Sequence, residues 1–253
     1  MIALIDGDLL VHQYTSPKDV DKATSGGQGT YRFPWDTTIK ALGHAIERLT
    51  EAVYADSCVV TFSHKQNFRK EFFPGYKAHR TNRKPIMMAD AIEWVTNKFN
   101  VKCRPGLEAD DVMGIMATRA PGEYIICSVD KDMKTIPGLH YNWKDDFAEI
   151  EEVGDEEAER FWWHQTVVGD RSDGYPGAAG IGEVGARKAL ADVPREQLWD
   201  AVLACFGGDV DAALLNARCA RILTAEYWDF ERGKPILWSP PASVCGEEGV
   251  EHE

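Results

Sequence analysis

Nine carboxylates stand in four short stretches of the chain, where apolar runs end or helical patterns begin. They are Asp6 and Asp8; Glu108, Asp110 and Asp111; Asp130 and Asp132; and Asp170 and Asp173. Gathered without cations, so many acidic groups would repel one another strongly. Carboxylate oxygens are the ligands that Mg²⁺ and Mn²⁺ prefer, and two such ions can clamp a phosphodiester. The pattern therefore predicts a two-metal site for phosphodiester chemistry.

Individual clusters also have structural alternatives. Acidic residues are favoured in the first turn of a helix, which would explain residues 108–111 as capping. The acids at 130–132 are explained equally well as turn residues after a strand. Asp6 differs, because the end of an apolar strand needs no carboxylate. Residues two apart on a helix point to different sides, so Glu108 must lie at or before the N-cap to share a metal with Asp110.

A basic loop lies between residues 65 and 84, where seven basic residues accompany a single acidic one, Glu71. Basic side chains contact phosphates and aromatic rings stack on unpaired bases. Tyr76 is the stacking candidate, whereas Phe72 and Phe73 are expected to pack inward. The alternative is a solvated basic loop whose aromatic residues all serve the core.

The glycines of "GAAGIGEVGARKAL" (177–190) predict a second phosphate contact. Gly180 and Gly182 allow a hairpin that exposes backbone N–H groups at the start of a helix. Arg187 and Lys188 add positive charge. A generic glycine-rich turn is the alternative, and a Walker-type phosphate loop is excluded because no GK[ST] follows the glycines.

Net charge alone speaks against a nucleic-acid partner, since the chain carries −13 at pH 7. The distribution of charge qualifies this conclusion. Residues 145–160 hold nine acids and one base, in contrast to the basic loop. We expect one face to bind a polyanion while another repels it.

Strand-like runs and helical patterns alternate in the first part of the chain. The runs are 2–6, 57–63, 101–105 and 123–128, and the helical patterns are 37–55, 86–99 and 108–120. This alternation predicts an α/β fold with a mostly parallel central sheet flanked by helices. Ligands of such sheets bind beyond the carboxyl ends of the strands, where the acids stand.

Three regions are expected along the chain. Residues 1–150 form an α/β core with a basic arch segment near 68–98, residues 151–240 form a wholly helical region from about 155 onward, and residues 241–253 form a solvated tail. No apolar run approaches the roughly 18 residues of a membrane helix. Six scattered cysteines and the absence of a basic leader favour a cytoplasmic protein with reduced thiols. No long heptad run appears, which favours a monomer.

Five segments in order resemble the 5′-nuclease superfamily of flap endonucleases and 5′→3′ exonucleases, and among them most the replicative exonucleases of tailed bacteriophages. They are "LIDGD", "NFRKEFFPGYKAHRTNRKP", "EADD", "SVDKDM" and "GDRSDGYPGAAGIG". The resemblance covers residues 2–190. It implies a PIN-like or resolvase-like sheet followed by a helix–three-turn–helix that binds DNA.

The resemblance also implies roles for single residues. A first Mg²⁺ or Mn²⁺ would be held by Asp6, Glu108 and Asp110. A second would be held by Asp130, Asp132 and Asp170, with Asp110 or Asp111 shared or further from the ions, and Asp173 supporting. Lys77 and Arg80 would stabilise charge on the scissile phosphate. Arg83, Lys84, Arg187 and Lys188 would contact phosphates, and Gly180, Ile181 and Gly182 would grip the duplex and hold K⁺.

Two departures from the family pattern stand out. Many relatives carry an aspartate at the end of the strand before the basic loop, where this chain has Ser63 and His64. Either the first metal site has one ligand fewer or Asp8 compensates, and we adopt the second alternative as a hypothesis. The arch segment between Tyr76 and Glu108 is also short compared with that of cellular flap endonucleases. A short arch favours exonucleolytic cleavage at duplex ends, nicks and gaps over threading of long single-stranded flaps.

The sequence thus predicts a metal-dependent 5′→3′ exonuclease or flap endonuclease of phage DNA replication or degradation, acting in the host cytoplasm. Its partners would be DNA with 5′ ends, nicks, gaps or flaps, and RNA–DNA hybrids. One alternative is a PIN-type ribonuclease, disfavoured because such domains lack the "GIGEVGARKAL" element. The other is a non-catalytic module that binds duplex DNA.

Overall fold

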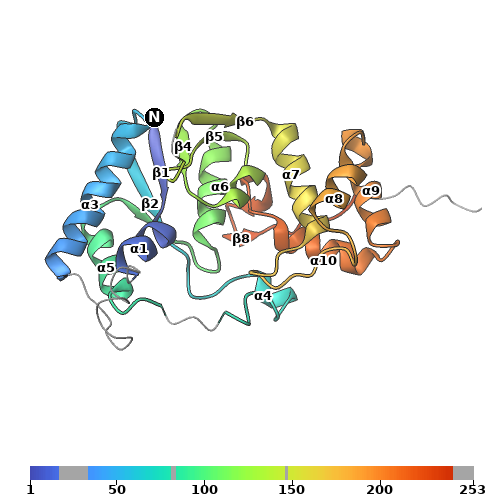
Figure 1. Ribbon diagram of the computed structural model, residues 1–253, viewed down its shortest axis with the longest axis horizontal. Coiled ribbons are helices and arrows are strands. Elements are labelled where there is room, and N and C mark those ends of the chain that lie inside the picture. Colours follow the sequence, from blue (N-terminus) through green and yellow to red (C-terminus); the bar gives the residue numbers. More distant parts are fainter. Residues whose placement is uncertain (17–33, 81–83, 146–147, 242–253) are drawn as a thin grey trace, which may run out of the picture.

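Figure 1 shows the computed structural model, which describes residues 1–16, 34–80, 84–145 and 148–241. A six-stranded sheet of order β3-β2-β1-β4-β5-β6 lies at its centre. Its strands are β1 (Ile2–Asp6), β2 (Ser57–Thr61), β3 (Val101–Lys102), β4 (Tyr124–Cys127), β5 (Gly138–Tyr141) and β6 (Ile150–Val153). The first five strands run parallel, and β6 pairs antiparallel with β5. The predicted mostly parallel sheet is confirmed.

Different helices cover the two faces of the sheet (Figure 1). They are α1 (Gly7–Thr15), α3 (Trp35–Ala52), α5 (Met88–Lys98) and α6 (Ala109–Arg119). On β1, Ala3 and Ile5 pack with α1, α3 and α5, whereas Leu4 packs with α6. Because both faces are buried, the central strands read as continuous apolar runs. The sequence predicted α3, α5 and α6 but not α1, which begins directly after β1.

Sequence analysis also missed β5 and β6. The acidic run at 145–160 supplies β6 as the antiparallel edge strand, with Glu151 and Glu152 exposed. Charged side chains on an edge strand discourage pairing with a further chain. In the basic loop, residues Arg69–Phe72 form the single helical turn α4.

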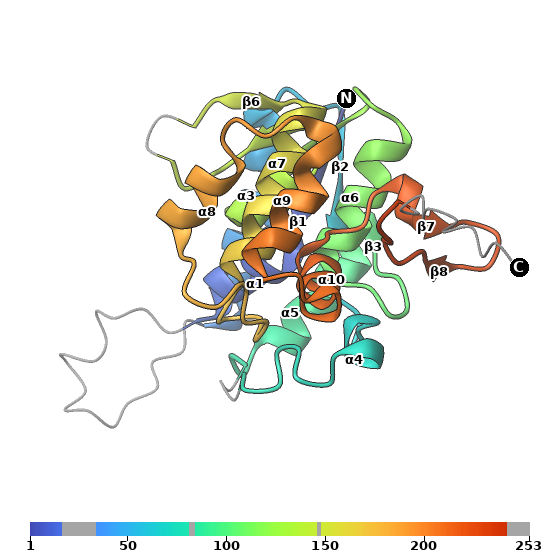
Figure 2. The same ribbon diagram turned by 90° about the vertical axis from the view of Figure 1, so that its right-hand side faces the viewer.

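Four further helices follow the sheet and are seen together in Figure 2. They are α7 (Asp155–Val168), α8 (Glu183–Leu190), α9 (Leu198–Cys205) and α10 (Val210–Ala220). They surround a second core that contains an aromatic cluster of Trp162, Trp163, Trp199 and Trp238. The expectation that this region is wholly helical is wrong, because β7 (Trp228–Asp229) and β8 (Lys234–Pro235) pair as a small antiparallel hairpin.

After α10 the chain returns to the α/β part. Ile222 packs against the sheet beside α6, and Leu223 and Trp228 pack on the neighbouring apolar cluster. The division near residue 150 therefore stays a prediction. The predicted tail falls almost entirely on residues 242–253, outside the described residues.

No helix in the described ranges has both the length and the apolar character needed to cross a membrane. Five cysteines lie in those ranges, and each is free of a disulfide: Cys58, Cys103, Cys127, Cys205 and Cys219.

Gly7 is predicted to be required for the close approach of α1 to β2. A Cβ at this position would lie 2.6 Å from the Thr61 carbonyl oxygen and 2.6 Å from the Phe62 ring. Gly7→Ala should therefore lower the free energy of unfolding by about 1–3 kcal/mol, as overpacking of a filled core does. Gly154→Ala is the control, since a Cβ there meets nothing within 4 Å. Urea denaturation checks both, and equal stability of Gly7→Ala and wild type would contradict the close approach.

Candidate metal centre and nucleic-acid interface

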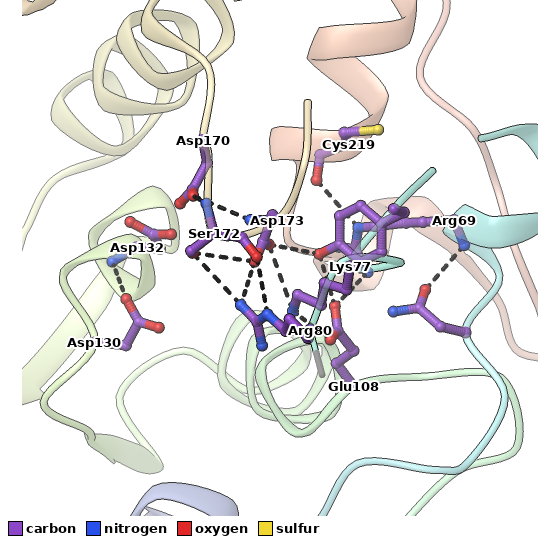
Figure 3. Close-up of polar contacts among 12 residues, drawn as sticks. Arg69, Lys77, Arg80, Glu108, Asp130, Asp132, Asp170, Ser172, Asp173 and Cys219 are labelled. Atoms are coloured by element: carbon purple, nitrogen blue, oxygen red, sulfur yellow. Dashed lines mark hydrogen bonds and ion pairs between the residues drawn. The ribbon is translucent and has the colours of Figure 1, made fainter. Parts of the chain in front are cut away.

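One cavity of about 350 Å³ lies beyond the carboxyl ends of β1 and β4. All predicted acids except Asp111 line it: Asp6, Asp8, Glu108, Asp110, Asp130, Asp132, Asp170 and Asp173. Lys77, Arg80 and Arg69 line it as well. Figure 3 shows several of these side chains converging from α6, the basic loop and the segment after α7. The fold thus brings the four acidic stretches together.

Asp6 serves both the cavity and the fold. Its carboxylate is the N-cap of α1, accepting a hydrogen bond from the Leu9 N–H at 3.0 Å, and it also accepts one from the Ser128 hydroxyl at 2.9 Å. Burial raises the pKa of Asp6 to about 7, helped by the nearby charges of Asp8 and Asp130 and opposed by these two hydrogen bonds. The inference that a carboxylate has no local role here was wrong, because α1 was not predicted.

The other unpaired acids are also held close to one another. Desolvation raises the pKa of Asp110 well above its ordinary value, and the charges of Asp6 and Asp130 add to the effect. Desolvation, followed by Asp130 and Asp170, raises the pKa of Asp132 to about 7. The Gln165 amide donates to Asp132. Asp130 caps a 3₁₀ turn by accepting from the Asp132 N–H at 2.9 Å, so the turn alternative and the cavity role both apply.

Asp170 shapes the loop after α7. Its side chain accepts from the Asp173 N–H at 3.1 Å, and its backbone exchanges hydrogen bonds with Tyr175 at 2.9 and 3.1 Å. The turn presents both Asp170 and Asp173 to the cavity.

Glu108 occupies the N-cap of α6, as shared use with Asp110 requires. The Lys77 ammonium lies 2.5 Å from one Glu108 oxygen, and the Tyr76 hydroxyl lies 2.9 Å from the other. Burial alone would raise the pKa of Glu108, but the charges of Lys77 and Arg69 outweigh it and lower the pKa to about 2. Glu108 is therefore ionised at neutral pH.

Asp111 does not line the cavity, which corrects its assignment as a direct metal ligand and leaves only the alternative of a place further from the ions. It is fully buried and pairs through both oxygens with the Arg69 guanidinium, each at 2.8 Å. It also accepts from the Leu223 N–H at 3.1 Å and completes the capping box of α6 with Glu108. Its charge is already compensated, so Asp111 is a structural residue, as the capping alternative held.

Tyr76 does not present its ring for stacking on a base, which corrects its assignment as a nucleic-acid-binding residue. Only 2% of the residue is exposed, and its ring belongs to the second core. Its hydroxyl lies 2.8 Å from an oxygen of Asp173 and 2.9 Å from one of Glu108. A phenol with two such partners is held inward rather than presented to a base.

Lys77 and Arg80 line the cavity beside the carboxylates. Lys77 has a backbone φ of 53°, sparsely populated for a residue with a side chain, and its N–H donates to the Asp173 carbonyl at 2.7 Å. The Arg80 guanidinium lies 2.6 Å from an Asp173 oxygen and donates to the Ser172 carbonyl at 2.8 Å. Asp173 thus holds both cations in place.

Asp8 contacts the strand end at which many relatives carry an aspartate. The Ser63 N–H donates to the Asp8 carboxylate at 2.9 Å, and the Ser63 hydroxyl accepts from the Ala109 N–H at 3.0 Å. His64 accepts backbone N–H bonds from Gln66 and Gly106, both at 3.2 Å. Ser63 and His64 therefore support the backbone, while Asp8 is the acid at this strand end.

The donor set suits divalent cations, although no ion cage is already formed. Among the described residues, no three His, Cys, Asp or Glu side chains are arranged to enclose one ion. Asp6 and Asp132 instead satisfy protein donors. The raised pKa values of three neighbouring carboxyls show that negative charge is poorly compensated there, which a hard cation would correct.

The predicted glycine hairpin leads into α8. Gly180 has a φ of +76°, a left-handed conformation that favours glycine, and Gly182 is the N-cap. Arg187 and Lys188 are exposed in the last turn of α8, and Lys84 is exposed at the end of the basic loop. Ile181 lies between the two glycines and is half-buried. Arg83 lies outside the described residues.

Sequence reasoning missed three supporting side chains, namely Arg69, Ser128 and Gln165. Arg69 was counted only among the basic residues of the loop, yet it is buried against Asp111. Ser128 and Gln165 hold Asp6 and Asp132. Their positions immediately after β4 and inside α7 gave no chemical signal of these contacts.

Comparisons with known proteins bear on the family and the fold of the chain. The family model of the 5′-3′ exonuclease N-terminal resolvase-like domain matches residues 1–159. The chain is 28% identical to the exonuclease of Escherichia phage T7, over 94% of this chain and 93% of that protein.

Two solved structures from phage T5 share the fold. The flap endonuclease, in a pseudo-enzyme-product complex with DNA and metal ions, has a TM-score of 0.66 and 16% identity, covering 89% of this chain and 90% of that one. The 5′-exonuclease with bound zinc has a TM-score of 0.64 and 17% identity, with the same coverage.

Stability without metal is predicted to rise as the pH falls from 8 to 6.5. Asp6 and Asp132 have pKa values of about 7 in the folded protein against 3.8 ordinarily, so in this window the folded state binds protons that the unfolded chain does not. The free energy of unfolding in EDTA should rise by on the order of 1 kcal/mol. His140, whose pKa is lowered by burial from an ordinary value of 6.5, opposes this trend near the lower end of the window, but only in part, because Asp6 and Asp132 both titrate within it.

Chemical denaturation at several pH values measures this dependence. Asp132→Asn should flatten it, because the amide does not titrate, and Mg²⁺ should stabilise the protein more at pH 8 than at pH 6.5. A free energy of unfolding in EDTA that is constant or falls toward pH 6.5 would contradict the account.

Proposed function

The chain belongs to the 5′-3′ exonuclease family, and from that premise we propose that its carboxylate cavity hydrolyses phosphodiesters near DNA 5′ ends. The observation that carries the proposal is the joint lining of one cavity by eight carboxylates and the cations of Lys77 and Arg80. The named activity of the phage T7 relative and the DNA and metal ions of the phage T5 structure support it.

Two divalent cations, Mg²⁺ or Mn²⁺, belong to this proposal. Asp6, Glu108 and Asp110 would hold one, and Asp130, Asp132 and Asp170 the other. When bound, such ions lower the pKa of water and stabilise charge on the attacking and leaving oxygens. The T5 structures with metal ions and with zinc support a divalent requirement.

Lys77 and Arg80 supply positive charge to the phosphate. Both are tethered at Asp173, with the Lys77 ammonium 3.4 Å and the Arg80 guanidinium 2.6 Å from its oxygens. Arg80 is about half exposed, so it can exchange part of this contact for a phosphate oxygen. Charged donors fixed before substrate arrives lower the cost of reorganising during the reaction.

In this proposal the duplex downstream of the scissile phosphate is bound outside the cavity. Gly180 and Gly182 offer backbone N–H groups on either side of Ile181, whose own N–H donates to the Ala178 carbonyl at 3.2 Å. The same three residues grip the duplex and hold K⁺ in this proposal, and Arg187 and Lys188 contact the same phosphates. Arg83 and Lys84 contact DNA on the arch side. The proposal also includes RNA–DNA hybrids as substrates. It further includes a monomeric state and action in a host cytoplasm.

The proposal predicts Mg²⁺-dependent release of mononucleotides or short oligonucleotides from the 5′ side of a nicked, recessed or flapped duplex. Mapping the ends of labelled products measures this and ranks the substrates. EDTA and Asp130→Ala should each abolish release. Duplex binding without cleavage under both Mg²⁺ and Mn²⁺ would contradict the proposal and favour the non-catalytic module.

Asp8 is predicted to act as a metal ligand in place of the absent aspartate. Asp8→Ala should slow cleavage at limiting Mg²⁺ by more than the roughly 10–100-fold in metal affinity that loss of a partner outside the ligand shell costs, and less at saturating Mg²⁺. Asp90→Ala, an exposed acid in the first turn of α5, is the matched control. Cleavage by Asp8→Ala at the wild-type rate under limiting Mg²⁺ would exclude the compensation.

A further inference from the structure

Arg69 is a positively charged residue buried at the base of the carboxylate cavity, with only 2% of its surface exposed. Two of its nitrogens donate to the Asp111 carboxylate at 2.8 Å each. It also donates to the backbone carbonyls of Cys219 at 3.1 Å and Arg221 at 2.6 Å. One terminal nitrogen lies 3.4 Å from Glu108, on the oxygen that faces the Tyr76 hydroxyl. Figure 3 shows Arg69 beside Glu108 and Cys219.

These contacts join three distant parts of the chain. Arg69 belongs to α4 in the basic loop, Glu108 and Asp111 begin α6, and Cys219 and Arg221 lie where α10 ends. The segment after α10 also lines the cavity through Ala220 and Ile222. The Arg69 guanidinium therefore holds the cavity wall formed by the segment after α10 against α6, the helix that begins at Glu108.

Arg69 also divides the two acids of α6 between different roles. Its planar fork matches both Asp111 oxygens, so Asp111 is compensated in charge and turned away from the cavity. Glu108 receives only the longer contact and keeps an oxygen toward Lys77 and the cavity. A lysine at position 69 would supply the charge without the fork.

We infer that Arg69 is a positioning residue for the metal centre, holding Glu108 and the segment after α10 in the arrangement that binds a divalent cation. It acts through Glu108 and does not touch substrate. The inference rests on the proposed function, because it assumes that Glu108 is a metal ligand.

Binding of Mn²⁺ without DNA tests this inference, followed by the loss of the free-ion electron paramagnetic resonance signal. Arg69→Met should weaken Mn²⁺ binding on the order of tenfold, the lower end of the effect of residues that orient metal ligands. Arg69→Lys should give an intermediate affinity. In cleavage assays at fixed Mg²⁺, Arg69→Met should lower kcat and leave the KM for DNA nearly unchanged.

A double variant separates positioning from stability. Arg69→Met alone leaves Asp111 as a buried uncompensated charge and should destabilise the fold. Adding Asp111→Asn removes that charge and should recover most of the stability, while the weak Mn²⁺ binding persists. If Arg69→Met does not fold, the double variant and Arg69→Lys provide the measurement.

Arg160→Met is the matched control. Arg160 also pairs with a carboxylate, Glu156, and donates to two backbone carbonyls, Leu190 at 3.1 Å and Val193 at 2.9 Å, but it lies outside the cavity. Its loss should lower stability without changing Mn²⁺ affinity.

Wild-type Mn²⁺ affinity in Arg69→Met, or its full recovery in the double variant together with stability, would overturn the inference. Failure of the proposed function would differ, because the wild-type protein itself would then bind no Mn²⁺ and cleave no DNA.

Discussion

Repulsion among carboxylates packed at the carboxyl ends of parallel strands is the constraint on which the rest of the structure depends. β1 and β4 run parallel and adjacent, so Asp6 and Asp130 are brought together by the sheet itself. Local structure holds the acids against this repulsion. Asp6 caps α1, Glu108 caps α6 and Asp130 caps a 3₁₀ turn, so ordinary capping contacts stabilise an electrostatically unfavourable cluster. The same residues that end or begin secondary structure elements therefore form the chemical site.

Charge in the cavity is divided into two halves. In one half each acid has a cationic partner: Glu108 has Lys77 and Asp173 has Arg80, while Asp111, behind the cavity, has Arg69. In the other half Asp6, Asp110 and Asp132 have raised pKa values because burial and neighbouring acids outweigh the opposing charges, which include Lys77 for Asp110 and Lys131 for Asp132. Divalent cations would correct this imbalance in the unpaired half, while the paired half keeps Lys77 and Arg80 in place for a phosphate. Glu108 connects the two halves, because it pairs with Lys77 and would also hold one of the divalent cations.

The features that could be predicted from the sequence were those that depend on local sequence patterns. Apolar runs gave the central strands, and the acids following them indicated the edge at which they meet. Helix geometry alone required Glu108 to lie at or before the N-cap if it is to share a metal with Asp110. The structure confirms that Glu108 is the N-cap of α6. The side-chain directions of Asp111 and Tyr76 did not follow, because their partners lie far away: Arg69 is 42 residues from Asp111 and Tyr76 is 97 residues from Asp173. The β7–β8 hairpin was missed since each of its strands is only two residues long.

Anomalous diffraction from crystals soaked in Mn²⁺ tests the central claim most directly, because it locates the cations rather than inferring them from rates. The account predicts two anomalous peaks inside the cavity, one bordered by Asp6, Glu108 and Asp110 and one bordered by Asp130, Asp132 and Asp170. Neither peak should contact Asp111, which remains paired with Arg69. An empty cavity at Mn²⁺ concentrations that support cleavage, or peaks found only outside it, would contradict the account.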